Sequence, residues 1–264
     1  MSEIHAKHKP YMKWFPIFDL DTIYERQIVY HSAEGVTPLG MAGGAYDTTN
    51  KKVPSGVVVG VNTTPSTALY NNTYKAGYIT DASPLSSTTD RFSATSVSPA
   101  GDRQALAKVA IITPATIIKA RIFNATYGTA PTVGTVSVGD ANGVSCPSSA
   151  TDVSGIANLG TIYFRTGANK GVYRITDDAS TTALTWDKAT PNAVAAGDTL
   201  VRVNLRVGGI SRVQFDSEAT FIDCSAACTA DYYGIIVVGL DLSRAGEEYV
   251  EFIFATDHFC PARA

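Results

Sequence analysis

Short apolar runs separated by turn-forming clusters recur along this 264-residue chain, and this alternation limits what it can fold into. The stretch from Thr37 to Val61, TPLGMAGGAYDTTNKKVPSGVVVGV, shows the pattern clearly, because glycines and a Pro-Ser-Gly turn lead into a run of valines. β-Branched residues favour strands, whereas Gly, Pro, Asn and Ser favour turns. Only 17% of the residues are charged, which leaves little material for amphipathic helices. We therefore expect a mainly β protein.

Further strand-length runs follow at a regular spacing that is typical of a β-sandwich or a barrel. They span Thr22 to Tyr30, Val57 to Val61, Tyr74 to Ile79, Val109 to Ile112 and Ile117 to Phe123 in the first half, with Ile235 to Leu240 and Tyr249 to Ala255 near the end. The pattern leaves room for only two short helices, one near Asp102 to Lys108 and one around Glu218 to Cys228.

The composition divides the chain into three parts. Residues 1–16 mix basic and aromatic side chains without a strand or helix period, so we expect an extended arm that orders against a partner. An ordinary frayed terminus with its aromatics on the body of the protein is the alternative. Residues 128–206 form an inserted small β module, and residues 17–127 plus 207–264 form one β domain from both chain ends.

Two close pairs of metal-type ligands stand near the C-terminus, Cys224 with Cys228 and His258 with Cys260. Cys and His in two pairs suit tetrahedral zinc. However, His258 and Cys260 are two residues apart, which places them on one face of a strand rather than in a knuckle turn. A disulfide and buried free thiols are the other two interpretations, and we expect neither a metal nor a cofactor.

The sequence carries no pattern of catalytic residues. Its acid pairs are Asp19/Asp21, Asp177/Asp178 and Glu247/Glu248, and two of the three lie in expected turns, where carboxylates cap the backbone. The four histidines accompany no G-x-S-x-G, HExxH, P-loop or GxGxxG motif. We therefore expect a protein that is not an enzyme.

Net charge and hydropathy exclude two classes of partner. A net charge of -3 gives no global attraction to nucleic acid, because such binding needs clustered Lys and Arg. The longest apolar run, Tyr232 to Leu240, has the length of a strand rather than of a membrane helix. The 13 tyrosines suit protein interfaces, although β-sheets are also rich in tyrosine.

Two segments carry a family resemblance. The first, TPLGMAGGAYDTTNKKVPSGVVVG, resembles the start of the head decoration proteins of tailed bacteriophages, through Leu39, Asp47, Lys51 or Lys52, and Gly56 to Gly60. The second, residues 160–203, is similar to a small β repeat of phage virion proteins, through Gly171-x-Tyr173-Arg174-Ile175 and Gly197-Asp198-Thr199. The resemblance implies a cement protein on the outer surface of a capsid shell, acting as a homotrimer bound to the major capsid protein.

On this interpretation the partner contacts lie in the arm and in the Gly-rich segment. The residues concerned are Lys9, Tyr11, Trp14, Phe15, Leu39, Asp47, Lys51 and Lys52. The alternative function is a receptor- or glycan-binding tail or fibre module, for which Tyr163, Tyr173 and Trp186 of the insertion would form the recognition surface.

Overall fold

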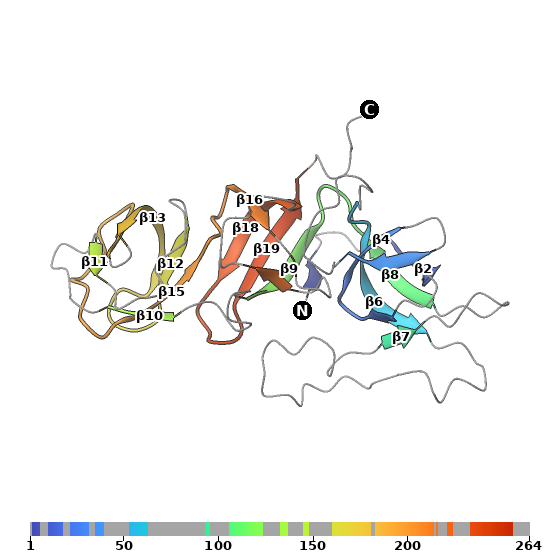
Figure 1. The fold of residues 1–264 in the computed structure, drawn as a ribbon, viewed down its shortest axis with the longest axis horizontal. Helices are drawn as coiled ribbons and strands as arrows, with labels where there is room; N and C mark the ends of the chain where they lie inside the picture. Colours follow the sequence, from blue (N-terminus) through green and yellow to red (C-terminus); the bar gives the residue numbers. More distant parts are fainter. Residues whose placement is uncertain are drawn as a thin grey trace.

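The computed structural model describes residues 2–5, 10–17, 22–31, 35–39, 53–62, 93–95, 106–123, 133–136, 145–147, 160–180, 183–213, 215, 221–223 and 233–255. All regular secondary structure in these residues is β-strand, so the expected mainly β fold is confirmed. No helix in the described part of the chain is long and apolar enough to cross a bilayer. Figure 1 shows three groups of strands, with β16, β18, β19 and β9 between the other two.

One group of strands, which we call the N-terminal barrel, is a five-stranded antiparallel sheet. Its order is β2 (Met12–Pro16), β8 (Leu106–Ile111), β6 (Gly56–Asn62), β4 (Ile28–His31) and β5 (Val36–Pro38). A parallel bridge between Ile17 and Val36 joins the end of β2 to β5, so the two outer strands of the sheet meet. The interior is filled by Ile17, Ile23, Val29, Val36, Val58, Ala107 and Val109.

Glycine is required where β6 begins. A Cβ at Gly56 would overlap Val109 Cγ1 and lie 2.8 Å from the carbonyl oxygen of Ala110. The Gly-rich stretch therefore allows β6 to pack closely against β8. Beside this barrel, β3 (Thr22–Tyr24) pairs with β7 (Ser93–Thr95) in a two-stranded sheet.

The middle group, which we call the central barrel, is built from both ends of the chain. Its strand order is β1 (Ser2–His5), β9 (Ile117–Phe123), β19 (Tyr249–Phe254), β18 (Tyr233–Asp241) and β16 (Ile210–Val213), with β17 (Phe221–Asp223) parallel to β9. A bridge between Phe215 and Ile222 connects the continuation of β16 to β17, which brings the two sides of the sheet together.

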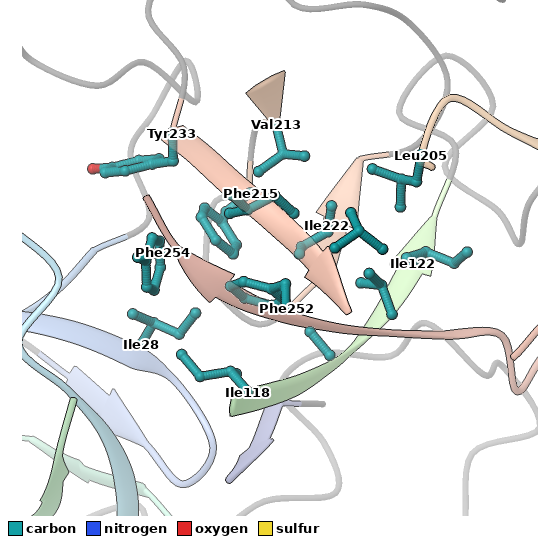
Figure 2. Packing of buried hydrophobic residues seen from close by; sticks show 14 of the residues in the cluster. Ile28, Ile118, Ile122, Leu205, Val213, Phe215, Ile222, Tyr233, Phe252 and Phe254 are labelled. Atoms are coloured by element: carbon teal, nitrogen blue, oxygen red, sulfur yellow. The ribbon is translucent and has the colours of Figure 1, made fainter. Parts of the chain in front are cut away.

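The core of the central barrel follows directly from strand alternation. Along β19, Val250, Phe252 and Phe254 are buried while the residues between them are half-buried. The rings of Phe215, Tyr233, Phe252 and Phe254 pack edge-on or tilted against one another, as Figure 2 shows, with centroids 5.4 to 6.4 Å apart. Ile28 of the N-terminal barrel belongs to the same cluster, so the two barrels share a core.

The third group, which we call the β module, contains only strands between residues 133 and 203. Its order is β10 (Val133–Thr135), β15 (Thr199–Val203), β12 (Thr161–Phe164), β13 (Gly171–Ser180), β14 (Ala183–Trp186) and β11 (Ser145–Pro147). The pairing of β13 with β14 shifts register twice, and such irregularities bend a strand. Its own core comprises Val136, Ile162, Phe164, Tyr173, Ile175, Trp186, Val194 and Leu200.

Strand β15 joins the module to the rest of the protein because both of its faces are buried. Leu200 packs in the module core, whereas Val201 and Val203 pack in the core of the central barrel. The inserted strands thus form their own sheet and share apolar packing with the central barrel. That residues 128–206 fold as a module of their own remains a prediction.

Three local expectations change. Residues 2–5 and 12–16 of the expected arm are extended, but they pair with β9 and β8 of the same chain. The short helix expected near Asp102 to Lys108 is wrong over 106–108, where β8 begins, because pairing with β2 and β6 on both sides outweighs a weak local helix preference. In the second expected helix, Phe221–Asp223 form strand β17. Cys224, Cys228, His258 and Cys260 lie outside the described residues.

Candidate functional site

Strand β2 has one backbone edge that no described strand covers. It pairs with β8 on one side only, and the Ile111 N–H donates to the Tyr11 carbonyl over 2.9 Å. In an antiparallel pair, hydrogen-bonded residues alternate with residues whose backbone groups point away from the partner. With Met12 opposite Ala110 and Trp14 opposite Lys108, the N–H and C=O of Met12 and Trp14 point outward. The bond from Ile112 N to Ser55 O supports this phase, because it assigns the even-numbered residues of β8 to the β6 side.

The side chains along this edge are unusually exposed for an apolar strand. Tyr11 is 70% exposed, Met12 37% and Trp14 44%, and Lys13 between them is also exposed. Trp, Tyr and Met are enriched in the centres of protein interfaces because they provide large contact areas. We call Tyr11–Trp14 the β2 edge.

Phe15 anchors the β2 edge to the barrel. Its ring meets the His31 ring edge-on at a centroid distance of 4.5 Å and an interplanar angle of 65°. The Lys13 Nζ lies 5.8 Å from the same phenyl centroid, within cation–π range. Partial burial lowers the pKa of His31, because the charged imidazolium is less well solvated there.

The charge beside the β2 edge is positive. Neither Lys13 nor Lys108 forms an ion pair with any residue that the structure describes. Glu25 is the carboxylate next to this region, since its Oε1 would lie 4.0 Å from a Cβ at Gly60, and Gly60 pairs with Lys108. Burial raises the pKa of Glu25, and the neighbouring Arg26 partly offsets that rise. Among the described residues, the edge therefore combines aromatic surface with two cations that form no ion pair, Lys13 on one face of the sheet and Lys108 on the other.

The structure places three of the predicted partner-binding residues together, and a fourth is buried in the core. Tyr11 and Trp14 are on the β2 edge, and Phe15 is half-buried at its end. Leu39 is fully buried, and its N–H donates to the Ile28 carbonyl over 2.8 Å. Leu39 is therefore a core residue, because a side chain without exposed surface cannot contact a partner. Lys9, Asp47, Lys51 and Lys52 lie outside the described residues.

Sequence reasoning missed Met12 and Lys13 as members of the edge. The signal that could have found them is the spacing of two prolines, Pro10 and Pro16, around five residues rich in aromatics. Proline is confined in sheets to edge strands and strand ends, because it lacks the N–H that a central strand needs.

The aromatic residues of the β module are in the opposite environment. Tyr173 and Trp186 are 5% and 4% exposed. Their rings meet Phe164 edge-on, each at a centroid distance of 5.6 Å. Tyr163 is half-buried against the core of the central barrel. Tyr173 and Trp186 are therefore core residues and do not provide the glycan-recognition surface expected of them, whereas Tyr163 keeps part of its surface exposed.

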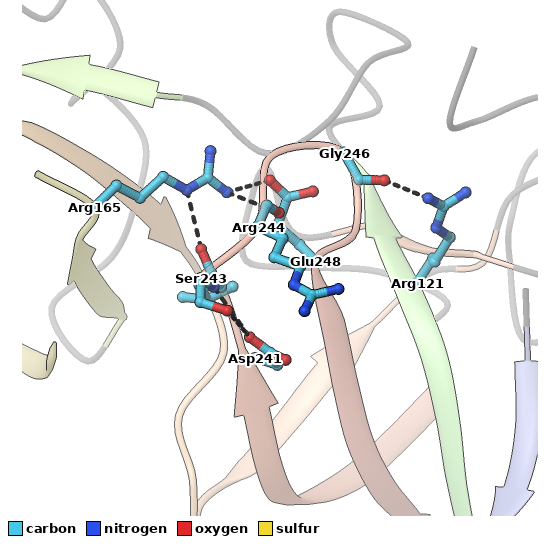
Figure 3. A network of polar contacts seen from close by, with 8 residues as sticks. Arg121, Arg165, Asp241, Ser243, Arg244, Gly246 and Glu248 are labelled. Carbon is cyan, nitrogen blue, oxygen red and sulfur yellow. Dashed lines mark hydrogen bonds and ion pairs between the residues drawn. The ribbon is translucent and has the colours of Figure 1, made fainter. Parts of the chain in front are cut away.

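A polar network that includes the buried charges of Arg165 and Glu248 lies where the module meets the central barrel. Figure 3 shows Arg165, which follows β12, reaching the loop between β18 and β19. Its guanidinium donates to Glu248, to the Leu242 carbonyl over 3.0 Å and to the Arg244 carbonyl over 3.3 Å. The side chains of Arg165 and Glu248 are 11% and 1% exposed. Because the Arg165 charge is paired and its Nε and Nη2 groups donate to the loop, this arrangement connects the module to the central barrel.

The rest of this loop is held by local hydrogen bonds. Arg121 donates to the Gly246 carbonyl. Asp241 accepts from the Ser243 hydroxyl over 2.6 Å and from the Ser243 N–H over 3.1 Å, and these bonds lower the pKa of Asp241. Among the described residues, no group of three His, Cys, Asp or Glu side chains is placed to hold a metal ion. The β2 edge is therefore the candidate functional site.

Comparison with known proteins finds no matching family model, no matching curated protein and no matching solved structure. Any function assigned to this chain must therefore be argued from its own residues.

Proposed function

We propose that this chain is a non-enzymatic structural virion protein, a cement protein that binds and stabilises the outer surface of a tailed-phage capsid. Its partners are the major capsid protein and further copies of itself, assembled as a homotrimer. The observation that carries the proposal is the β2 edge, where Tyr11, Met12 and Trp14 leave apolar surface exposed on a rigid barrel.

Two features of the fold support an assembly role. The β2 edge is preformed, because the Ile17–Val36 bridge and the Phe15–His31 contact hold the strand in place without a partner. A preformed surface loses little conformational entropy on binding, which favours association. Many copies on a repeating shell then add their individually modest contacts through multivalency.

The three β groups also suit a protein that must resist mechanical and thermal stress. The central cluster takes residues from the N-terminal barrel, the central barrel and strand β15 of the module. The buried Arg165–Glu248 pair adds a second connection between module and central barrel. A force applied to one group of strands would therefore be transmitted to the others through packed side chains rather than through a linker.

The proposal is tested with undecorated shells assembled from the major capsid protein of the same virus. We expect the purified chain to sediment with the shells and to raise their disruption temperature. A Tyr11→Ser/Trp14→Ser double variant should lose both effects while keeping its own unfolding midpoint. Absence of sedimentation and of thermal protection by the wild-type chain would refute the cement function.

The abundance of the protein in purified particles gives an independent check. A shell-binding protein is expected at a copy number comparable with that of the capsid lattice. A tail or fibre module is expected at the much lower copy number of a tail structure. A low copy number would move the assignment from the shell to the tail.

A further inference from the structure

We propose that the β2 edge binds its partner by strand addition, accepting a short extended segment that carries an acidic residue between two apolar ones. This inference rests on the proposed assembly role of β2 and specifies the chemistry of the contact. It follows from the outward backbone groups, the two prolines and the charge of this edge.

The outward edge offers a short and defined set of hydrogen-bonding groups. Met12 and Trp14 present their N–H and C=O groups away from β8, as the register and the Ile111–Tyr11 bond require. Pro10 and Pro16 occur in the same phase, two residues before Met12 and two after Trp14, and neither has an N–H to offer. An added strand can therefore form its full set of bonds only in one register, centred on Lys13.

The closure of the barrel limits the length of the added strand. At Ile17 the position beside β2 is already occupied by Val36 of β5. An incoming segment must end before this bridge, so the edge accepts a few residues and cannot extend into an open-ended stack. Edges that are blocked in this way avoid uncontrolled aggregation while remaining available to a specific partner.

The side chains determine which segment fits. Met12 and Trp14 project on one face of the strand, and Lys13 projects on the other. Directly opposed residues on an added strand share these faces, so apolar residues would meet Met12 and Trp14 while the residue between them would meet Lys13. Lys13 has no ion-pair partner in the described part of the chain, whereas the cation Lys108 is opposite Trp14 and therefore on the other face of the strand. An acidic residue at the central position is therefore favoured.

The test uses the full chain and a synthetic peptide, acetyl-Ser-Thr-Val-Glu-Val-Thr-Ser-amide. The chain has two tryptophans, of which Trp186 is buried, so a change in emission on binding reports mainly on Trp14. We expect the peptide to shift the emission to shorter wavelength and to slow hydrogen exchange at the Met12 and Trp14 amides. Replacing the central Glu of the peptide by Lys should weaken binding by up to about fivefold, as for a cross-strand charge pair.

Two variants of one residue separate strand addition from side-chain contact. Met12→Pro removes an outward N–H but leaves the pairing with β8 intact, so peptide binding should be lost. Met12→Ala keeps the N–H and serves as its matched control, and it should still bind. Lys13→Glu should reverse the preference and favour the Lys peptide. Equal binding by the Met12→Pro and Met12→Ala chains, or equal binding of the Glu and Lys peptides, would overturn the inference.

A modified peptide covers the case in which Met12→Pro does not fold. Methylating the two backbone nitrogens that face β2 leaves the side chains unchanged, so undiminished binding of the methylated peptide would equally overturn strand addition.

Shell binding distinguishes failure of strand addition from failure of the proposed function. If wild-type and Met12→Pro chains sediment equally with shells, strand addition fails and the cement function stands. If the wild-type chain does not sediment, the cement function itself fails.

Discussion

Both tryptophans of this protein lie on β-strands, but their side chains have opposite environments. Trp14 on β2 is 44% exposed at the edge of the N-terminal barrel, whereas Trp186 on β14 is 4% exposed in the core of the β module. The rings of Phe164 and Tyr173 contact Trp186, whereas the cation Lys108 is opposite Trp14 in the strand register. The environment of an aromatic residue here depends on the position of its strand in the sheet.

This contrast separates the aromatic residues that stabilise the fold from those that are exposed for binding. The module uses its aromatics to fill a small core, and little large apolar surface remains exposed on its described strands besides Val172. The N-terminal barrel fills its core with Ile, Val and Ala and leaves Tyr11, Met12 and Trp14 exposed. Substitutions in the two regions should therefore affect different measurements.

The largest expected effect is on the free energy of unfolding of Trp186→Ala. Removing a buried ring that touches Phe164 and Tyr173 leaves a cavity, which costs about 3–5 kcal/mol for Trp in a core. Urea unfolding followed by circular dichroism measures this loss. Trp186→Phe is the control and should recover much of it. An unchanged midpoint for Trp186→Ala would show that the module core does not contribute to the measured transition.

Breaking the Arg165–Glu248 pair should come next. Glu248→Ala leaves the Arg165 guanidinium buried without its carboxylate, which typically costs about 3 kcal/mol when one partner of a buried pair is removed. The double variant Arg165→Met/Glu248→Leu removes both charges, so it should be more stable than Glu248→Ala. Chemical denaturation of the wild-type chain and the two variants tests the order. A double variant less stable than the single one would show that Arg165 without its carboxylate is not destabilising, because it still donates to the Leu242 and Arg244 carbonyls.

The alternation of apolar and turn residues predicted the strands, because backbone pairing needs only local patterning. It could not predict how the sheets close, since the Ile17–Val36 and Phe215–Ile222 bridges depend on strand curvature. The short helix expected over part of β8 failed for a related reason, as tertiary pairing on both sides overrides weak helix propensity.

The candidate site was only partly predictable. Tyr11 and Trp14 were selected as aromatics in an expected arm, and both are on the exposed edge. Leu39 was selected from a Gly-rich stretch, but the hydrogen bond of its N–H to Ile28 draws it into the core. Exposure depends on which neighbours a fold brings to each side chain, and a single sequence does not contain that information for Trp14 against Trp186.

Trp14→Ala should change binding far more than stability. The side chain already exposes 44% of its surface, so its removal should alter the free energy of unfolding by at most about 1 kcal/mol. Sedimentation with undecorated shells should fall sharply, because exposed Trp residues often dominate interface energies. Val59→Ala, on strand β6, which β8 separates from β2, is 40% exposed, serves as the matched control and should bind normally. Equal binding by both variants would place the contact surface elsewhere.

The smallest expected effect is a pH dependence of the unfolding free energy that comes from His31, beside the β2 edge. Burial lowers the pKa of His31 below its usual value of 6.5, so the folded chain disfavours the imidazolium. The stability that the neutral ring contributes is therefore complete above pH 6.5 and is lost as the pH falls through the lower folded-state pKa. Protonation of His31 would also place a positive charge against the Phe15 ring, which the Lys13 ammonium already approaches. A histidine NMR titration should give a midpoint below 6.5, and the unfolding free energy of His31→Gln should depend less on pH than that of the wild type between pH 7 and 5. A His31 midpoint at or above 6.5 would show that the folded chain accommodates the charged ring beside Phe15 and that acid does not destabilise this contact.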